Sequence, residues 1–139
     1  MSCCRTVRIR TTPVVIAQHL EWVAPSSLDQ ERQNFAQALD AWREARSTGD
    51  IQGLRALYSE RFQPGGEDPG TWWRRVETEL RQPLPVQLKD TSLLKWQDSQ
   101  ETMVVTFGEV PVGQSRGTTR RQYWARENGQ WKIFYERST

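Results

Sequence analysis

Two apolar-rich runs flank Asn128-Gly129 near the end of the chain, and this arrangement constrains the fold more than any other feature of the sequence. The dipeptide readily adopts positive φ at both positions, so it suits the two-residue type I′ turn of a β-hairpin. Pairing across that turn predicts these opposed pairs: Glu127–Gln130, Arg126–Trp131, Trp124–Ile133, Tyr123–Phe134 and Arg121–Glu136. Because each favourable pair contributes roughly 0.2–1 kcal/mol, the sequence predicts that the chain ends in an antiparallel hairpin.

A long amphipathic helix is predicted earlier in the chain. Ser26 or Ser27, directly after Pro25, can act as its N-cap, and Thr48-Gly49 can end it. Its apolar side chains recur at the i, i+3, i+4 and i+7 spacing of one helix face: Phe35, Ala38, Leu39 and Trp42. This spacing predicts a helix that packs against the rest of the domain.

Two shorter helices are expected to follow. Asp50 can cap the first, whose apolar side comprises Ile51, Leu54, Leu57 and Tyr58, with Phe62 just beyond. The segment 63–70 is rich in Gly and Pro and is predicted to be a loop. Thr71 can cap the second helix, which stops before Pro83 because the residue preceding a proline disfavours the helical conformation.

The hydrophobic period changes to two after Pro85. An extended or bulged strand is predicted over about 86–96, and Met103, Val105 and Phe107 alternate along a second strand. A glycine-bearing turn near 113–117 then leads into the terminal hairpin. Three helices followed by about four strands predict an α+β fold with a mostly antiparallel sheet.

The charge distribution argues against two classes of function. The net charge of +2 comes from residues 1–25, whereas residues 26–139 hold sixteen basic and sixteen acidic side chains. Nucleic-acid binding is not expected, since such proteins concentrate basic charge on the folded surface. No membrane span is expected either, because no run approaches the ~18 apolar residues that one needs.

Residues 1–25 are interpreted as an N-terminal tail or linker, or as the product of a mis-assigned start, and residues 26–139 as the folded domain. No helical or strand periodicity runs through the tail. Its apolar stretch at 13–17 is shorter than the ~7–15-residue core of a signal peptide, so the sequence alone predicts a cytoplasmic location. No metal or cofactor is expected, because Cys3-Cys4 has no second cysteine pair or nearby histidine to complete a site.

Two groups of residues carry a family resemblance. The first is Phe35…Trp42…Gly49-Asp50…Leu57-Tyr58…Phe62, and the second is Tyr123-Trp124-x-Arg126-x-x-Gly129-x-Trp131-Lys132-Ile133…Glu136. With this layout, residues 28–136 resemble the nuclear-transport-factor-2-like superfamily, which includes the SnoaL-like domains. The resemblance implies a cone-shaped fold, in which a curved sheet wraps around the three N-terminal helices.

Within that superfamily the chain is most similar to the small domain appended to some bacterial L,D-transpeptidases and related cell-envelope proteins. This narrower resemblance implies a periplasmic or envelope location. It does not imply transpeptidase activity, because Ser2-Cys3-Cys4-Arg5 lacks the glycine of the Ser-x-Gly-Cys nucleophile motif.

No catalytic residue is predicted. The enzymes that this chain resembles move protons with a histidine and a carboxylate inside the cone, but His19, the only histidine, lies outside the region of resemblance. Asp40 and Glu136 are the carboxylates considered as bases. The predicted hairpin register pairs Glu136 with Arg121, which favours a structural role for this carboxylate.

Aromatic side chains suggest a pocket for a small molecule or a glycan. The pocket-lining candidates are Trp42, Tyr58, Trp73, Trp124, Tyr135 and Glu136. The alternative is that the aromatic residues simply fill the core. Trp72 and Trp73 cannot share one buried helix face, so one of the two is expected at a pocket rim or an interface.

Both faces of the terminal hairpin carry aromatic side chains. Trp124, Trp131 and Tyr135 are predicted on one face, and Tyr123 and Phe134 on the other. Because helices cover only one side of the sheet, the other side is expected to form a homodimer, which the resemblance also implies.

The favoured function is therefore a non-catalytic binding or assembly domain associated with the bacterial cell envelope. One alternative is a small-molecule enzyme of the isomerase, dehydratase or cyclase type that uses a carboxylate base in the cone. The other is a free-standing module that binds a small ligand without chemistry.

Overall fold

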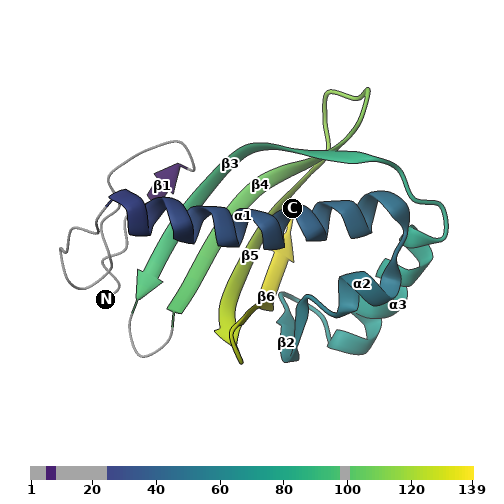
Figure 1. Ribbon diagram of the computed structural model, residues 1–139. Helices are drawn as coiled ribbons and strands as arrows, with labels where there is room; N and C mark the ends of the chain where they lie inside the picture. The colour runs from purple at the N-terminus through teal and green to yellow at the C-terminus, as the bar shows by residue number, and fades with distance from the viewer. Residues whose placement is uncertain (1–5, 9–24, 98–100) are drawn as a thin grey trace.

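The computed structural model describes the backbone of residues 6–8, 25–97 and 101–139. Its helices are α1 (Pro25–Thr48), α2 (Ile51–Arg55) and α3 (Pro69–Leu80). Its strands are β1 (Thr6–Arg8), β2 (Tyr58–Pro64), β3 (Val86–Gln97), β4 (Glu101–Pro111), β5 (Thr118–Glu127) and β6 (Gln130–Ser138). The long helix α1 runs across one face of the sheet, here called the inner face, while α2 and α3 lie at one end of the molecule (Figure 1). The predicted α+β class is confirmed.

The sheet is mixed rather than purely antiparallel. In spatial order its strands are β1-β3-β4-β5-β6-β2, and every neighbouring pair is antiparallel except β2 and β6, which are parallel. Strands β3 to β6 are the predicted ones, and the bulge expected in the first of them lies between Lys89 and Ser92. The prediction of about four strands was too low, because β1 and β2 also join the sheet.

The two additional strands occupy segments for which the sequence predicted no strand. Residues 6–8 lie in the predicted tail and pair with Ser92–Leu94 of β3. Strand β2 begins at Tyr58, where a helix end was predicted, and extends into the predicted loop. It pairs with β6, whose residues lie about 70 positions later in the chain. Strand β1 is too short, at three residues, to show a hydrophobic period. Strand β2 depends on a partner far along the chain, so its own sequence carries no strong strand pattern.

Helix α1 has the predicted end and the predicted apolar face, but it begins at Pro25, so Ser26 and Ser27 lie within the helix instead of capping it. Phe35, Leu39 and Trp42 are buried, and the backbone N–H groups of Gly49 and Asp50 both donate to the carbonyl of Ala45. Gly49 has φ +76°, and a Cβ atom there would lie 2.8 Å from the carbonyl oxygen of Leu80. The glycine therefore allows the end of α1 to pack closely against the end of α3.

We expect Gly49→Ala to lower the free energy of unfolding by about 2–3 kcal/mol, because it combines positive-φ strain with a backbone clash. Urea denaturation measures this loss. Gly66→Ala is the matched control, since Gly66 has φ +86° but nothing within 4 Å of its added Cβ, and its expected cost is about 1 kcal/mol. Equal losses for the two variants would contradict the close packing at Gly49.

The N-cap of α3 is Asp68, three residues before the predicted cap, Thr71. The carboxylate of Asp68 accepts a hydrogen bond from the backbone N–H of Thr71 at 3.0 Å, and Pro69 occupies the first helical turn. Proline fits there because its φ is already helical and no intrahelical bond is lost. The side chain of Trp72 is buried, whereas that of Trp73 is only partly buried.

The terminal hairpin has the predicted turn but only part of the predicted register. Asn128 and Gly129 both have positive φ, and the pairs Trp124–Ile133 and Arg126–Trp131 are confirmed. Beyond them a bulge makes Phe134 an extra residue, so Tyr123 lies opposite Tyr135. The predicted pairs Tyr123–Phe134 and Arg121–Glu136 are therefore wrong as strand partners: Glu136 lies opposite Gln122, and Arg121 opposite Arg137.

The bulge also corrects the predicted faces of β6. Trp131 and Ile133 share one face, as predicted, and it is the inner one, but a residue inserted after them reverses the alternation. Tyr135 is therefore outside and only partly buried, whereas Glu136 is inside and 1% exposed.

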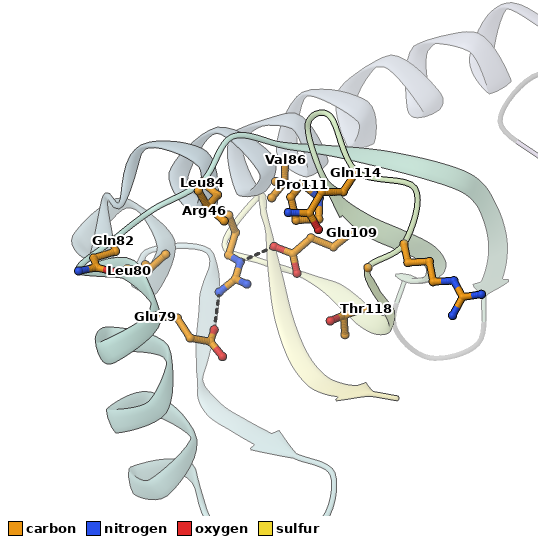
Figure 2. Close-up of a pocket in the computed structure, with 12 residues that line it drawn as sticks. Arg46, Glu79, Leu80, Gln82, Leu84, Val86, Glu109, Pro111, Gln114 and Thr118 are labelled. Atoms are coloured by element: carbon orange, nitrogen blue, oxygen red, sulfur yellow. Dashed lines mark hydrogen bonds and ion pairs between the residues drawn. The ribbon is translucent and has the colours of Figure 1, made fainter.

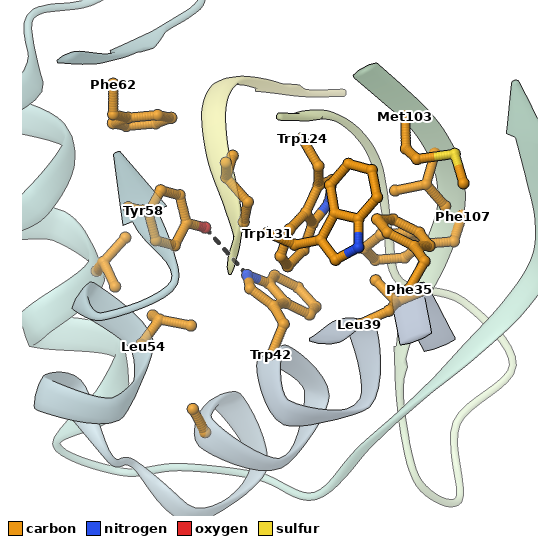
Figure 3. Packing of buried hydrophobic residues seen from close by; sticks show 14 of the residues in the cluster. Phe35, Leu39, Trp42, Leu54, Tyr58, Phe62, Met103, Phe107, Trp124 and Trp131 are labelled. Carbon is orange, nitrogen blue, oxygen red and sulfur yellow. Dashed lines mark hydrogen bonds between the residues drawn. The ribbon is translucent and has the colours of Figure 1, made fainter. Parts of the chain in front are cut away.

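The space between α1 and the inner face of the sheet is filled by aromatic side chains (Figure 3). Phe35 packs edge-on against Trp124 and Trp131, with ring centroids 5.3 and 5.5 Å apart. Trp42 contacts Phe107 in the same way at 5.3 Å. Such edge-to-face contacts add to the gain from burying large apolar surfaces.

Candidate functional site

Four of the six predicted pocket residues come together inside the fold. Trp42, Tyr58, Trp124 and Glu136 are all buried and belong to one hydrogen-bonded cluster. The other two lie elsewhere. Trp73 is partly buried on α3, with the guanidinium of Arg55 4.3 Å from its ring centroid, and Tyr135 lies on the outer face of the sheet.

The carboxylate of Glu136 is the centre of this cluster. It accepts hydrogen bonds from the hydroxyl of Tyr58 at 2.6 Å, from Nη1 of Arg120 at 2.9 Å and from Nε2 of Gln122 at 3.0 Å. Both of its oxygens are engaged. The side chain that the sequence assigned to a surface-type pair with Arg121 is instead a buried ion-pair partner of Arg120.

Two indole groups extend the cluster toward α1 and along β5. Nε1 of Trp42 donates to the hydroxyl of Tyr58 at 3.0 Å, and Nε1 of Trp124 donates to Oε1 of Gln122 at 2.9 Å. Both indole N–H groups thus have an acceptor within the interior, as buried polar groups generally must.

A second carboxylate connects this cluster to the surface. Glu109 accepts from Nε of Arg120 at 2.6 Å and from Nε of Arg46 at 2.7 Å. Nη1 of Arg46 then donates to Glu79, whose side chain is 44% exposed, at 3.1 Å. Both arginines also lie 5.7 Å from the ring centroid of Trp42. Charges of alternating sign therefore run from the solvent to the centre of the fold.

Electrostatics keep Glu109 and Arg120 in their charged forms. Burial alone would raise the pKa of Glu109, but the guanidinium groups of Arg120 and Arg46 outweigh it and lower that pKa. Burial likewise opposes the charge of Arg120, but Glu136 and Glu109 raise its pKa. Burial and the nearby charge of Glu136 raise the pKa of Tyr58 well above the usual value, so its phenol stays protonated and donates.

A cavity of about 370 Å3 lies where this charged chain reaches the surface (Figure 2). Its charged part is Arg46 with Glu79 and Glu109, and its remaining walls come from the end of α3, the start of β3 and the β4–β5 turn: Leu80, Gln82, Leu84, Val86, Pro111, Gln114, Arg116, Gly117 and Thr118. None of the six predicted pocket residues lines this cavity, and neither does any aromatic side chain.

Gly117 shapes the cavity through a close backbone approach. A Cβ atom there would lie 1.9 Å from the carbonyl oxygen of Glu109, so only glycine lets the β4–β5 turn fold back onto β4 at this point.

Neither Glu109 nor Arg120 was predicted as a site residue from the sequence. The signal that could have found them is their place in the alternation: Glu109 follows Met103, Val105 and Phe107 at the same period of two, and Arg120 precedes Trp124 in the same way. A charge at an inward position must find a partner. An acid and a base predicted on one face are therefore candidates for a buried pair.

Among the described residues, no group of three or more His, Cys, Asp and Glu side chains could hold a metal ion. None of the described helices is both long enough and apolar enough to cross a membrane.

Comparison with known families identifies the family of this chain. Residues 34–137 match the model of the Cds6 C-terminal NTF2-like domain. The chain belongs to this NTF2-like family. The resemblance to the nuclear-transport-factor-2-like superfamily is thereby confirmed. No protein with a curated function matches the sequence.

Several solved structures share the NTF2-like fold. Bd1075 of Bdellovibrio bacteriovorus superposes with a TM-score of 0.70 at 19% identity, over 87% of this chain and 44% of that one. Pgp2, a helical cell shape determining protein of Campylobacter jejuni, gives 0.62 at 16% identity, over 83% of this chain and 42% of that one. A proposed dehydratase from the NTF2-like family of Streptomyces avermitilis gives 0.60 at 16% identity, over 79% and 95%. The chain thus spans less than half the length of Bd1075 and of Pgp2.

Proposed function

We propose that this NTF2-like domain is a non-catalytic binding and assembly module that acts at the bacterial cell envelope as a homodimer. The observation that carries the proposal is the state of its interior. Glu109 and Glu136, the buried carboxylates of the described residues, are both bound by arginine. The polar groups inside the fold therefore stabilise one another and leave no free acid or base for a substrate.

A general base needs a reachable lone pair and a pKa near the working pH. Glu136 has no reachable lone pair, because it is 1% exposed and both oxygens accept hydrogen bonds. Glu109 does line the cavity, but its two arginine partners lower its pKa and make it a weak base. Asp40, the other carboxylate considered from the sequence, is exposed on α1 and pairs with Arg43 at 2.9 Å.

The envelope role draws on two relatives. Pgp2 is a helical cell shape determining protein, and the part of it that resembles this chain is less than half of its length. Bd1075 is likewise matched over less than half of its length. Both cases fit the idea of a fold that is appended to a larger protein, as the predicted likeness to the transpeptidase-appended domains implies.

The runner-up is a small-molecule enzyme of the isomerase, dehydratase or cyclase type. Glu109 favours it, since this carboxylate lines the cavity, and the proposed dehydratase from Streptomyces avermitilis has a similar fold. In the third alternative, a free-standing ligand-binding module, the same cavity would hold a small molecule without chemistry. A glycan is the weaker ligand for this cavity, because no aromatic ring lines it for stacking.

The outer face of the sheet is the surface that we assign to assembly. Tyr123 contacts Tyr135 and Phe134 there, with ring centroids 5.4 and 6.1 Å apart. All three side chains are only partly buried. An aromatic cluster of this kind on a sheet face is typical of an interface, and a two-fold dimer through it would bury at least ~1,000 Å2 in total.

Sedimentation equilibrium tests this assembly. We expect the wild type to be a dimer at tens of micromolar and Phe134→Glu to be a folded monomer, because the variant places a charge among the aromatic rings. Leu84→Glu is the matched control, since Leu84 is 57% exposed at the cavity and away from the outer face. It should leave the dimer intact. A wild type that sediments as a monomer over this range would contradict the proposed assembly.

A further inference from the structure

The outer face of β5 has a self-complementary order of side chains. Arg120, Gln122 and Trp124 are buried on the inner face, so the alternate residues point outward. In chain order these are Arg121, Tyr123, Ala125 and Glu127. A positive charge and a large ring are followed by a small side chain and a negative charge.

The positive end of this row lacks a counter-charge. Arg121 lies directly opposite Arg137 of β6, and both side chains are exposed. Like charges in this position repel each other. Among the described residues neither arginine has an ion-pair partner, and the contact of Arg121 is with the ring of Tyr123, at 5.8 Å.

The negative end lacks a donor. Oε2 of Glu127 is buried yet accepts no hydrogen bond from any described residue. Nη2 of Arg61 lies 3.9 Å away, too far for a hydrogen bond, on a side chain that is 82% exposed. Glu127 also lines a groove of about 270 Å3 with Arg61, Ala125 and Phe134. A desolvated carboxylate oxygen is costly unless a donor reaches it.

A second copy of this chain can satisfy both ends at once. In a two-fold interface, a contact from residue i to residue j is repeated from j to i. If the two β5 strands run antiparallel across the interface, with the axis passing near Trp124, residues 121 and 127 face each other, and so do residues 123 and 125.

We propose that two copies pack their outer faces in this register. The guanidinium of Arg121 in each copy pairs with the carboxylate of Glu127 in the other, whose side chain is 24% exposed. The ring of Tyr123 in each copy packs at the groove of the other, which is lined by Arg61, Ala125, Glu127 and Phe134. This inference rests on the proposed homodimer and specifies which residues of the outer face meet.

Charge reversal tests the register. In Arg121→Glu two glutamates face each other at both contacts, and in Glu127→Arg two arginines do. Each variant alone should dimerise at least about tenfold more weakly than the wild type, because facing like charges are strongly unfavourable. An equimolar mixture of the two variants should form a heterodimer of near wild-type affinity, since every glutamate then faces an arginine. The double variant Arg121→Glu/Glu127→Arg should recover as a homodimer.

The measurement is sedimentation velocity of each sample across a concentration series, with thermal melts to establish that each variant is folded. Arg74→Glu is the matched control, because Arg74 is an exposed arginine on α3, away from the sheet, and it should dimerise like the wild type. If the wild type is a dimer but both single reversals dimerise equally well, or if mixing restores nothing, the register is wrong while the homodimer stands. If the wild type is a monomer, the homodimer itself is wrong.

Discussion

Replacing Glu136 by alanine is expected to lower the free energy of unfolding by about 3–5 kcal/mol, the loss typical of removing one partner of a buried ion pair. Arg120 would keep only one of its two buried carboxylates, and the hydroxyl of Tyr58 and the amide of Gln122 would both lose an acceptor. Chemical denaturation with tryptophan fluorescence as the probe measures the loss, because Trp42 and Trp124 lie beside the affected groups.

The matched control for this prediction is Glu77→Ala. Glu77 also forms an ion pair with an arginine, Arg55, at 2.9 Å, but the two side chains are 44% and 46% exposed. Exposed pairs contribute about 0–1 kcal/mol, so this variant should be nearly as stable as the wild type. A loss below about 1 kcal/mol for Glu136→Ala would mean that the interior charges are not coupled as the distances indicate.

Trp42→Ala is expected to have an effect of the same size, a loss of about 3–5 kcal/mol. This side chain is 1% exposed, packs against Phe107 and lies beneath the guanidinium groups of Arg46 and Arg120. Its removal leaves a large cavity at the point where the apolar core meets the buried charges. Differential scanning calorimetry would record a much lower melting temperature.

The companion variant Trp42→Phe separates packing from hydrogen bonding. It keeps a ring in the core but removes the N–H group that donates to Tyr58. Its expected cost is about 1–2 kcal/mol. If the alanine and phenylalanine variants were equally stable, packing of the indole would not be the main contribution of Trp42.

The sequence predicted the elements whose signals are local. The turn at Asn128-Gly129 depends on the conformational preferences of two residues, and the end of α1 on one glycine and an apolar stripe. Strand β2 was missed because it forms by pairing with β6, far along the chain, while its first residue, Tyr58, also completes the apolar side of the preceding helix. The predicted helix does form, as α2, but it ends at Arg55.

The bulge at Phe134 was missed for a different reason. A run of alternating side chains fixes a register only if no residue is inserted, and the sequence around Phe134 contains no glycine or proline to mark an insertion. The bulge is favoured by tertiary contacts. It allows Glu136 to face inward, where Arg120, Gln122 and Tyr58 bind it.

The candidate site shows the same division. Aromatic residues were conspicuous in the sequence, and three of the pocket candidates, Trp42, Tyr58 and Trp124, belong to one buried cluster. The cavity itself is built from charged and aliphatic side chains of four separate segments. These side chains come together only in the folded domain, so the spacing of residues in the sequence could not predict the cavity.

The extra residue in β6 links the two sides of the sheet. The bulge at Phe134 places Glu136 on the inner face and Tyr135 in the outer aromatic cluster. Loss of the bulge without a change of length would exchange them, placing Tyr135 opposite Gln122 on the inner face and Glu136 opposite Arg121 on the outer face. Charge balance inside the domain and the character of its outer surface are thus set together by one backbone irregularity.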